Sequence, residues 1–339
     1  MRYGIWTPLP HTIRPEPRME AAIEASRTPG RGQPRDGAHD FAVEVAQTGE
    51  RLGFATTLIA ERWLGPDLSA WMLASAMAAE TSTIELMVAL HPGIVQPQQA
   101  AKFAASLDRI SGGRAAVNIV NGWWEEEFRL FSNGGSQQDL DERYRRMEEY
   151  LRVMRGMWSN ESFDFDGEFY HAYGEALPLA CVQQPGPPVY AGTRNPPGMK
   201  TIAELGDCWF VNYDPDMRSA GANVDMVAND IASMRRQAES FGRKLRFGMS
   251  CHVICRETQS EAEAEALALE EHGKTDRISF IASKALGPGL IGTPERIAER
   301  IRAYEQAGVD TLMMHCHPMI DSMQVFATEV MPLVRRVAA

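Results

Sequence analysis

Short apolar runs alternate with amphipathic helical patterns along the chain. The apolar runs are rich in aliphatic and β-branched residues, which is typical of buried parallel strands. Eight such runs cover residues 2–7, 55–59, 84–90, 115–120, 188–191, 208–211, 246–255 and 310–316. Helical patterns include 41–52, 98–111, 142–158, 225–241, 294–306 and 322–337. Because eight alternating strand and helix units can close a ring, the pattern predicts an α/β fold, a (β/α)8 TIM barrel in which residues 1–339 form one domain.

Glycines mark the ends of several predicted helices. Gly53, Gly112, Gly242 and Gly308 each follow a helical pattern and precede an apolar run. Glycine readily adopts the left-handed conformation that ends many helices. The repeated order of helix, glycine and strand therefore supports the predicted boundaries.

Three segments interrupt the rhythm and are predicted to be insertions in loops at the C-terminal face of the barrel. Residues 9–40 contain five Pro and three Gly, which indicates a long loop after the first strand. Residues 125–141 follow the fourth strand and are a candidate lid. Residues 160–187 include an alternating stretch that predicts a hairpin turning at Asp166 and Gly167.

Composition narrows the class of protein. The 339 residues carry 34 Lys and Arg against 45 Asp and Glu, a formal charge of −11, which disfavours nucleic acid as a partner. No signal peptide or membrane-spanning run is found, so we expect a cytoplasmic enzyme with no membrane partner. Five cysteines are an odd number, and we interpret them as reduced thiols.

The fourth predicted strand ends in an unusual group of polar and aromatic residues. Asn118 and Asn121 are followed by Trp123 and Trp124. Loops at the carboxyl ends of parallel strands carry ligands in barrel folds. Amides beside a flat aromatic pair favour a planar, polar ligand at this position.

The fifth strand is followed by Gly192, Thr193 and Arg194, which open into a helical run. Backbone N–H groups, a hydroxyl and a guanidinium at the positive end of a helix dipole suit a phosphate. An ordinary capped helix N-terminus with a solvent-exposed arginine would give the same sequence pattern. Both a phosphate site and a helix start without a ligand therefore remain open.

Four histidines lie at or just after predicted strand ends: His91, His252, His315 and His317. A set of imidazoles at one edge of a barrel could hold a metal ion, which makes a metal-dependent hydrolase an alternative. The amide-rich and Trp-rich fourth strand favours a flat cofactor instead, and we expect no metal.

Several separated motifs together resemble the bacterial luciferase-like flavin monooxygenases. Within that family the chain is most similar to the dimethyl sulfone and alkanesulfonate monooxygenases, with the pyrimidine oxygenase next. The resemblance spans about residues 42–336. Its motifs are Ile110–Arg114, Val117–Trp123, Asp141–Tyr144, Gln183–Pro188, Arg246–His252 and Leu290–Pro294.

The resemblance implies reduced FMN and O2 as cofactors, with FMNH2 supplied by a separate NAD(P)H:flavin reductase and a peroxyflavin as the oxygenating species. It carries the following residues over to the flavin: Ala60, Glu61, Asn118, Glu127, Arg143, Tyr144, Gly192, Thr193 and Arg194. Candidates for the catalytic acid and oxyanion donors are His252, His317, His91 and Asn118. Trp6, Trp63, Trp123 and Trp124 are candidates for the walls of a dry pocket.

Two departures from the alkanesulfonate pattern bear on the substrate. Ser250 stands where that branch has an arginine, and the substrate-gating loop with its own arginine is shortened to about residues 284–289. We therefore expect a neutral or weakly charged small molecule, such as a sulfone, an amide or a heteroaromatic ring. A deazaflavin-dependent reductase of the same superfamily is a further alternative, and kinship suggests a homodimer or homotetramer.

Overall fold

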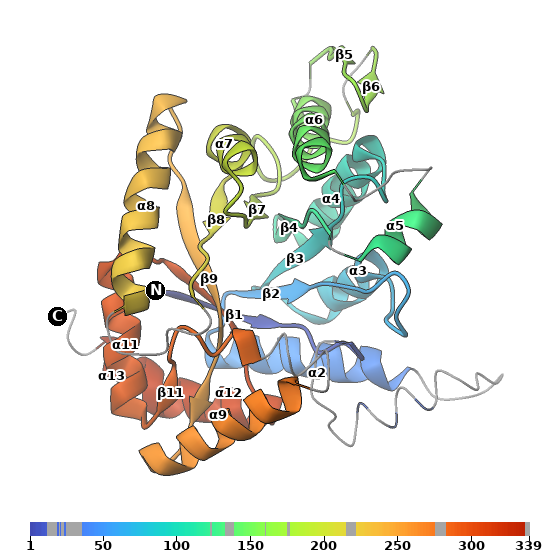
Figure 1. Ribbon diagram of the computed structural model, residues 1–339. Helices are drawn as coiled ribbons and strands as arrows, with labels where there is room; N and C mark the ends of the chain where they lie inside the picture. The colour runs from blue at the N-terminus through green and yellow to red at the C-terminus, as the bar shows by residue number, and fades with distance from the viewer. Residues whose placement is uncertain are drawn as a thin grey trace. The chain divides into compact units, whose positions relative to one another are not determined.

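Eight parallel strands form a closed barrel in the computed structural model, which describes residues 1–11, 19, 21, 24, 36–122, 124–132, 139–159, 161–174, 177–214, 222–274 and 283–335 (Figure 1). In ring order the strands are β1 Arg2–Trp6, β12 Thr311–His315, β9 Arg246–His252, β8 Cys208–Phe210, β7 Val189–Ala191, β4 Ala115–Ile119, β3 Glu85–Leu90 and β2 Thr56–Ile59. The predicted barrel is confirmed, and each predicted strand overlaps a strand of the ring.

The described helices follow the strands in chain order. They are α2 Gly37–Leu52, α3 Ala70–Glu80, α4 Pro97–Ser111, α5 Glu125–Phe131, α6 Leu140–Trp158, α7 Pro196–Leu205, α8 Ala222–Ser240, α9 Gln259–Gly273, α11 Pro294–Gln306, α12 Met319–Val325 and α13 Met331–Arg335, with a π-helical turn Phe326–Val330 before α13. The predicted glycine caps are confirmed, since Gly53, Gly112, Gly242 and Gly308 all have positive φ. None of the described helices is long and apolar enough to cross a membrane.

By its contacts the chain divides into two compact units. Unit 1 contains residues 1–57, 210–234 and 246–339, and unit 2 contains residues 58–209 and 235–245. Unit 2 carries β3, β4 and β7, whereas unit 1 carries β1, β9 and β12.

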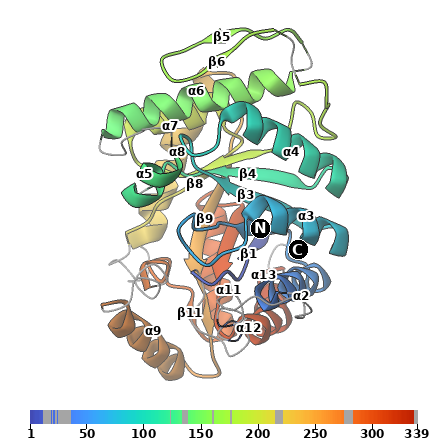
Figure 2. The ribbon, with the colours of Figure 1, turned by 90° about the vertical axis from the view of Figure 1, so that its right-hand side faces the viewer.

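Two short sheets lie outside the barrel. In unit 2, β5 Phe165–Asp166 pairs with β6 His171–Ala172 as the predicted antiparallel hairpin, although the turn occupies residues 167–170. The Glu149 carboxylate of α6 accepts hydrogen bonds from the backbone N–H groups of residues 168–170, which fixes the hairpin against that helix. Figure 2 shows β5 and β6 beside α6. The hairpin follows α6 and precedes β7, rather than following a strand of the barrel.

The other small sheet corrects the prediction of one continuous strand over 246–255. The run divides at Val253, whose N–H donates to the His315 carbonyl, and β10 Ile254–Cys255 then pairs with β11 Ile291–Gly292. The helix α9 follows β10 and begins with a capping box formed by Thr258 and Glu261. Unit 1 therefore carries a helix and a two-stranded sheet between β9 and α11.

The other two predicted insertions, residues 125–141 and 9–40, are described to different extents in the structure. Residues 125–131 of the candidate lid form the short helix α5, whose Glu127 and Phe128 are buried. Most of the predicted loop 9–40 lies outside the described residues. Its described end, Asp36, caps α2 by accepting hydrogen bonds from the N–H groups of Ala38 and His39.

Candidate functional site

Thr193, which is predicted to hold a phosphate, meets Tyr144, a predicted flavin contact, in unit 2 at the start of α7. The Tyr144 hydroxyl of α6 lies 2.6 Å from Thr193 Oγ1, and Trp209 Nε1 donates to the Thr193 carbonyl at 3.1 Å. Gly198 fits closely beneath this pair, because a Cβ at that position would lie 2.4 Å from Tyr144 Cε1 and 2.8 Å from Thr193 Cγ2. Two hydroxyl groups are thus held together beside a helix N-terminus.

The backbone at this turn offers fewer donors than the sequence suggested. Pro196 and Pro197 occupy the first turn of α7 and carry no N–H, and the Asn195 N–H donates to Thr193 Oγ1 at 3.0 Å. Gly192 and Arg194 are both exposed. Binding of an anion here would therefore depend on the hydroxyls and the Arg194 guanidinium more than on the helix dipole.

A second group forms at the ends of β3 and β4, also in unit 2. Asn118 pairs in register with Ala89, and His91 follows the last residue of β3. Both side chains are buried, at 8% and 5% exposed. Within the described part of the chain, the Asn118 amide makes no hydrogen bond, so its polar atoms are available to a ligand.

The loop after β4 packs on this group. Gly122 has φ +68°, and a Cβ there would lie 2.3 Å from the Phe128 ring and 3.6 Å from His91 Cδ2. Arg143 Nη1 donates to the Gly122 carbonyl at 3.1 Å. The two predicted flavin contacts Asn118 and Arg143 are therefore linked through the Gly122 turn and the strand that leads into it.

Glu61 is a buried carboxyl directly after β2. It is 7% exposed, and burial raises its pKa to about 7, a shift to which the nearby Asp67 and Glu127 add and which a backbone hydrogen bond at Ala70 opposes. Its neighbour Ala60 is partly exposed. A carboxyl group with this pKa exchanges protons near neutral pH, which suits a general acid.

Glu127 has local partners in the protein. Its carboxylate is 1% exposed, lies 3.2 Å from Arg62 Nη1 and accepts the Leu64 N–H at 3.4 Å. The Arg62 guanidinium lies 5.8 Å from the Trp124 ring. Glu127 therefore joins α5 to the loop after β2, while Trp123 lies outside the described residues.

Unit 1 carries a row of aromatic rings at the ends of three neighbouring strands. The Trp6 indole stacks on His315 with centroids 4.4 Å apart, and His315 is parallel to His252 at 6.3 Å. Burial alone lowers the pKa of His315 to about 3, so this imidazole is neutral. In this row His252, a predicted catalytic residue, lies parallel to the neutral His315 ring.

The remaining predicted residues of unit 1 have separate places. Ser250 lies within β9 opposite Met313, partly exposed. His317 lies two residues beyond the end of β12, so the alternation of side chains along the strand does not set its direction relative to His315. Among the described residues, no three His, Cys, Asp or Glu side chains come together as metal ligands.

Some residues of these groups escaped the sequence-based prediction. His315 was expected only as a metal ligand, yet it is the central ring of the stack. Gly198 and Phe128, which support Tyr144 and the Gly122 turn, were not predicted. A glycine inside the helical pattern of α7 was the one available signal, because such a glycine lowers helix stability unless a close contact requires it.

Comparison with known proteins gives a consistent result. The family model described as luciferase-like monooxygenase matches residues 19–311. An FMNH2-dependent dimethylsulfone monooxygenase from Pseudomonas putida is 29% identical over 329 residues, covering 87% of this chain and 88% of the relative.

Solved structures of low sequence identity share the fold. An EDTA monooxygenase from Chelativorans sp. BNC1 has a TM-score of 0.76 at 16% identity, covering 99% of this chain and 93% of its own. The oxygenating constituent of 3,6-diketocamphane monooxygenase from Pseudomonas putida, solved in complex with FMN, has a TM-score of 0.70 at 17% identity over 98% of both chains.

Proposed function

Because the chain belongs to the luciferase-like monooxygenase family, we propose that it is the oxygenase component of a two-component system. A separate NAD(P)H:flavin reductase supplies FMNH2, and the enzyme uses O2 to oxygenate a small organic substrate. The name of the 29% identical relative and the FMN complex of one structural neighbour support reduced FMN as the cofactor.

The pairing of Tyr144 with Thr193 at the start of α7 carries this proposal. Within the pair one hydroxyl donates to the other, so the second hydroxyl keeps a proton for a phosphate oxygen, and the nearby Arg194 adds the positive charge that a phosphate monoester requires in an acidic protein. The close fit of Gly198 under Tyr144 holds the two hydroxyls in place before the ligand arrives. These residues fit the phosphate end of FMN.

The group around the ends of β3 and β4 fits the ring of the flavin. The buried Asn118 amide offers both a donor and an acceptor to a heteroaromatic ring edge, and His91 and Arg143 supply further polar atoms. When bound, reduced FMN supplies the electrons that activate O2. The burial of Asn118 and His91 keeps water from this part of the site.

Each unit contains candidate proton donors of its own. Glu61, with its pKa of about 7, carries a proton in part of the molecules at neutral pH and can donate it. In unit 1, His252 lies parallel to the neutral His315 ring, and His317 is a second candidate acid. Both histidines can protonate or hydrogen-bond an oxygen atom on which negative charge develops.

The substrate that we propose is neutral and has a hydrogen-bond acceptor, as a sulfone, an amide or an oxygenated heteroaromatic ring does. Ser250 replaces the arginine of the alkanesulfonate branch, so this position lacks a cation for a sulfonate. The buried Trp6 Nε1–H has no hydrogen-bond partner within the described residues, and a sulfonyl or carbonyl oxygen would satisfy it.

The test is an anaerobic titration with FMNH2 followed by oxygen-uptake measurements on a panel of sulfones, amides and azaheterocycles. We expect saturable binding of FMNH2 and substrate-dependent O2 consumption with one oxygen atom recovered in the product. A reduced deazaflavin and a metal analysis run in parallel address the two alternatives. Binding of the deazaflavin in preference to FMNH2, or turnover under argon, would refute the proposal.

A further inference from the structure

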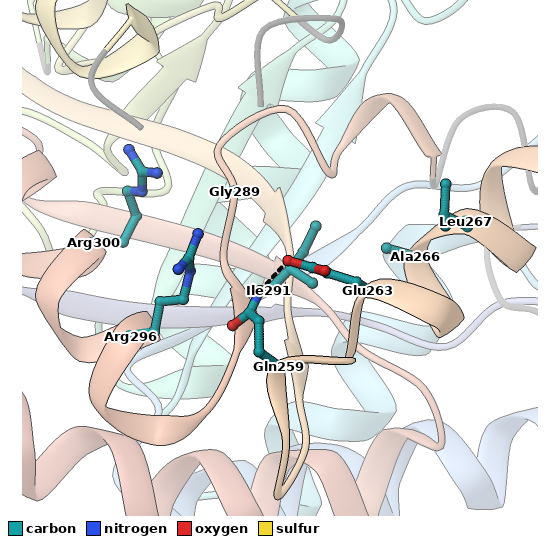
Figure 3. Close-up of a pocket in the computed structure, with 8 residues that line it drawn as sticks. All are labelled: Gln259, Glu263, Ala266, Leu267, Gly289, Ile291, Arg296 and Arg300. Carbon is teal, nitrogen blue, oxygen red and sulfur yellow. Dashed lines mark hydrogen bonds between the residues drawn. The ribbon is translucent and has the colours of Figure 1, made fainter. Parts of the chain in front are cut away.

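A cavity of about 270 Å³ lies wholly within unit 1, where α9, β11 and the start of α11 meet (Figure 3). None of the residues that line it belongs to the predicted flavin or histidine sites. Its volume is somewhat below the range of about 300–1,000 Å³ that is typical of sites for drug-sized ligands. The cavity therefore suits a small metabolite.

One wall of the cavity is positively charged. Arg296 and Arg300 are one helical turn apart on α11, and Figure 3 shows both side chains rising from that helix on the same side. Across the described ranges neither guanidinium makes a salt bridge or a hydrogen bond. Two adjacent cations that form no ion pair among the described residues favour binding of anionic groups.

The facing wall carries a fixed negative charge. Glu263 of α9 accepts a hydrogen bond of 2.7 Å from Gln259 Nε2, shown by the dashed line in Figure 3. Gln259 is itself confined, because a Cβ on Gly292 would lie 2.2 Å from Gln259 Oε1. The Glu263 carboxylate is exposed and retains lone pairs for a ligand cation.

Apolar side chains complete the lining. Ala266 and Leu267 come from α9, and Ile291 comes from β11 between the charged walls. These groups suit a short methylene chain rather than a polyhydroxylated ligand. Together the walls present two positive charges, one negative charge and a small apolar surface.

We propose that this cavity binds a small amino dicarboxylate. Each carboxylate of the ligand pairs with one of the arginines, the ammonium group pairs with Glu263, and the methylenes lie against Ala266 and Ile291. The charges of such a ligand complement those of the cavity one for one. Inorganic phosphate would satisfy the arginines but would also face the Glu263 carboxylate, a like charge.

The experiment is calorimetric titration of the full-length protein, without flavin, with three probes. L-Glutamate carries all three charged groups, glutarate lacks the ammonium, and 4-aminobutanoate lacks one carboxylate. The variants are Arg300→Gln and Glu263→Gln, with Arg236→Gln as the matched control because this exposed arginine of α8 lies outside the cavity. Sulfate is titrated as a simple anion.

We expect L-glutamate to bind the wild type more tightly than glutarate or 4-aminobutanoate, by about tenfold in each case. Arg300→Gln should lower the affinity for glutamate by about tenfold, while Arg236→Gln should leave this affinity unchanged. Glu263→Gln should weaken the binding of glutamate but not that of glutarate. A general loss of structure would weaken the binding of both ligands.

Equal binding of glutamate, glutarate and sulfate would overturn the proposal, as would the absence of heat at millimolar glutamate. Glutamate binding that Arg300→Gln leaves unchanged would overturn it as well. FMNH2 affinity is measured on the same preparations. Because the cavity and the flavin residues are different sets, each proposal can fail while the other stands.

Discussion

Replacing Gly198 with alanine tests the proposed phosphate site most directly. The added Cβ would lie 2.4 and 2.5 Å from two carbons of the Tyr144 ring and 2.8 Å from Thr193 Cγ2. Carbon atoms approach comfortably to about 3.5 Å, so the tyrosine ring must retreat by about 1 Å. The Tyr144–Thr193 hydrogen bond, 2.6 Å long, would then exceed its usual range.

The Gly198→Ala substitution should weaken FMNH2 binding without unfolding the protein. Loss of an ordered hydroxyl pair at a phosphate contact costs about 1–1.5 kcal/mol, which corresponds to about tenfold weaker FMNH2 binding. Crowding costs about 1–3 kcal/mol of folding free energy, while alanine in place of glycine in a helix recovers about 1 kcal/mol. The variant should therefore remain folded.

The assay is an anaerobic FMNH2 titration, with a thermal unfolding scan of each variant. Lys200→Ala is the control, because this exposed residue lies on the same helix. Tyr144→Phe removes only the hydroxyl and should also weaken FMNH2 binding. This variant provides the test if Gly198→Ala fails to fold. Unchanged FMNH2 affinity in a folded Gly198→Ala protein would refute the assignment of Tyr144 and Thr193 to the phosphate.

Three further predictions concern proton-binding groups. Because burial raises the Glu61 pKa from about 4.5 to about 7, its contribution to stability is fully present below pH 4.5 and is lost as pH rises through 7. In urea unfolding from pH 5 to 8, the free energy of unfolding of the wild type should fall by about 2 kcal/mol relative to Glu61→Gln. Parallel pH profiles of the two proteins would contradict the raised pKa. The pH dependence that His315 contributes has the opposite sign, since its lowered pKa gives stability that is present above about pH 6.5 and is lost as pH falls toward 3. Between pH 7 and 5 the free energy of unfolding of the wild type, measured in the same way, should fall by about 2 kcal/mol relative to His315→Phe. An equal loss in both proteins would exclude this role of His315. His252→Ala should lower the oxygenation rate at saturating FMNH2 by about 100-fold, as expected for loss of a general acid, while FMNH2 affinity stays near normal; an unchanged rate in oxygen-uptake assays would remove His252 from the mechanism.

The apolar runs in the sequence predicted the barrel, because the strands of the barrel are buried on both faces. A strand such as β4, with all five residues buried, is apolar apart from Asn118, and this composition is visible without a structure. The helix α9 was missed for the opposite reason. It buries only Ala262, Ala266, Leu269 and Gly273, so its apolar residues form too weak a stripe for recognition by periodicity.

The candidate sites divide in the same way. The motifs at Asn118, Tyr144 and Thr193 can be recognised in the sequence, and their resemblance to a known family implies flavin contacts without any knowledge of their geometry. The stack of Trp6, His315 and His252 is not readable, because residues so far apart in the chain are neighbours only through the ring order β1, β12, β9. The register then sets His315 opposite His252.

The sequence by itself determined the strand and helix pattern, the glycine caps and the chemical types of residue at the strand ends, since these depend on local composition and spacing. Tertiary structure alone decided which of these residues touch and how each one titrates. A carboxyl or imidazole changes its pKa through burial, as Glu61 and His315 do, and burial depends on atoms brought from distant parts of the chain.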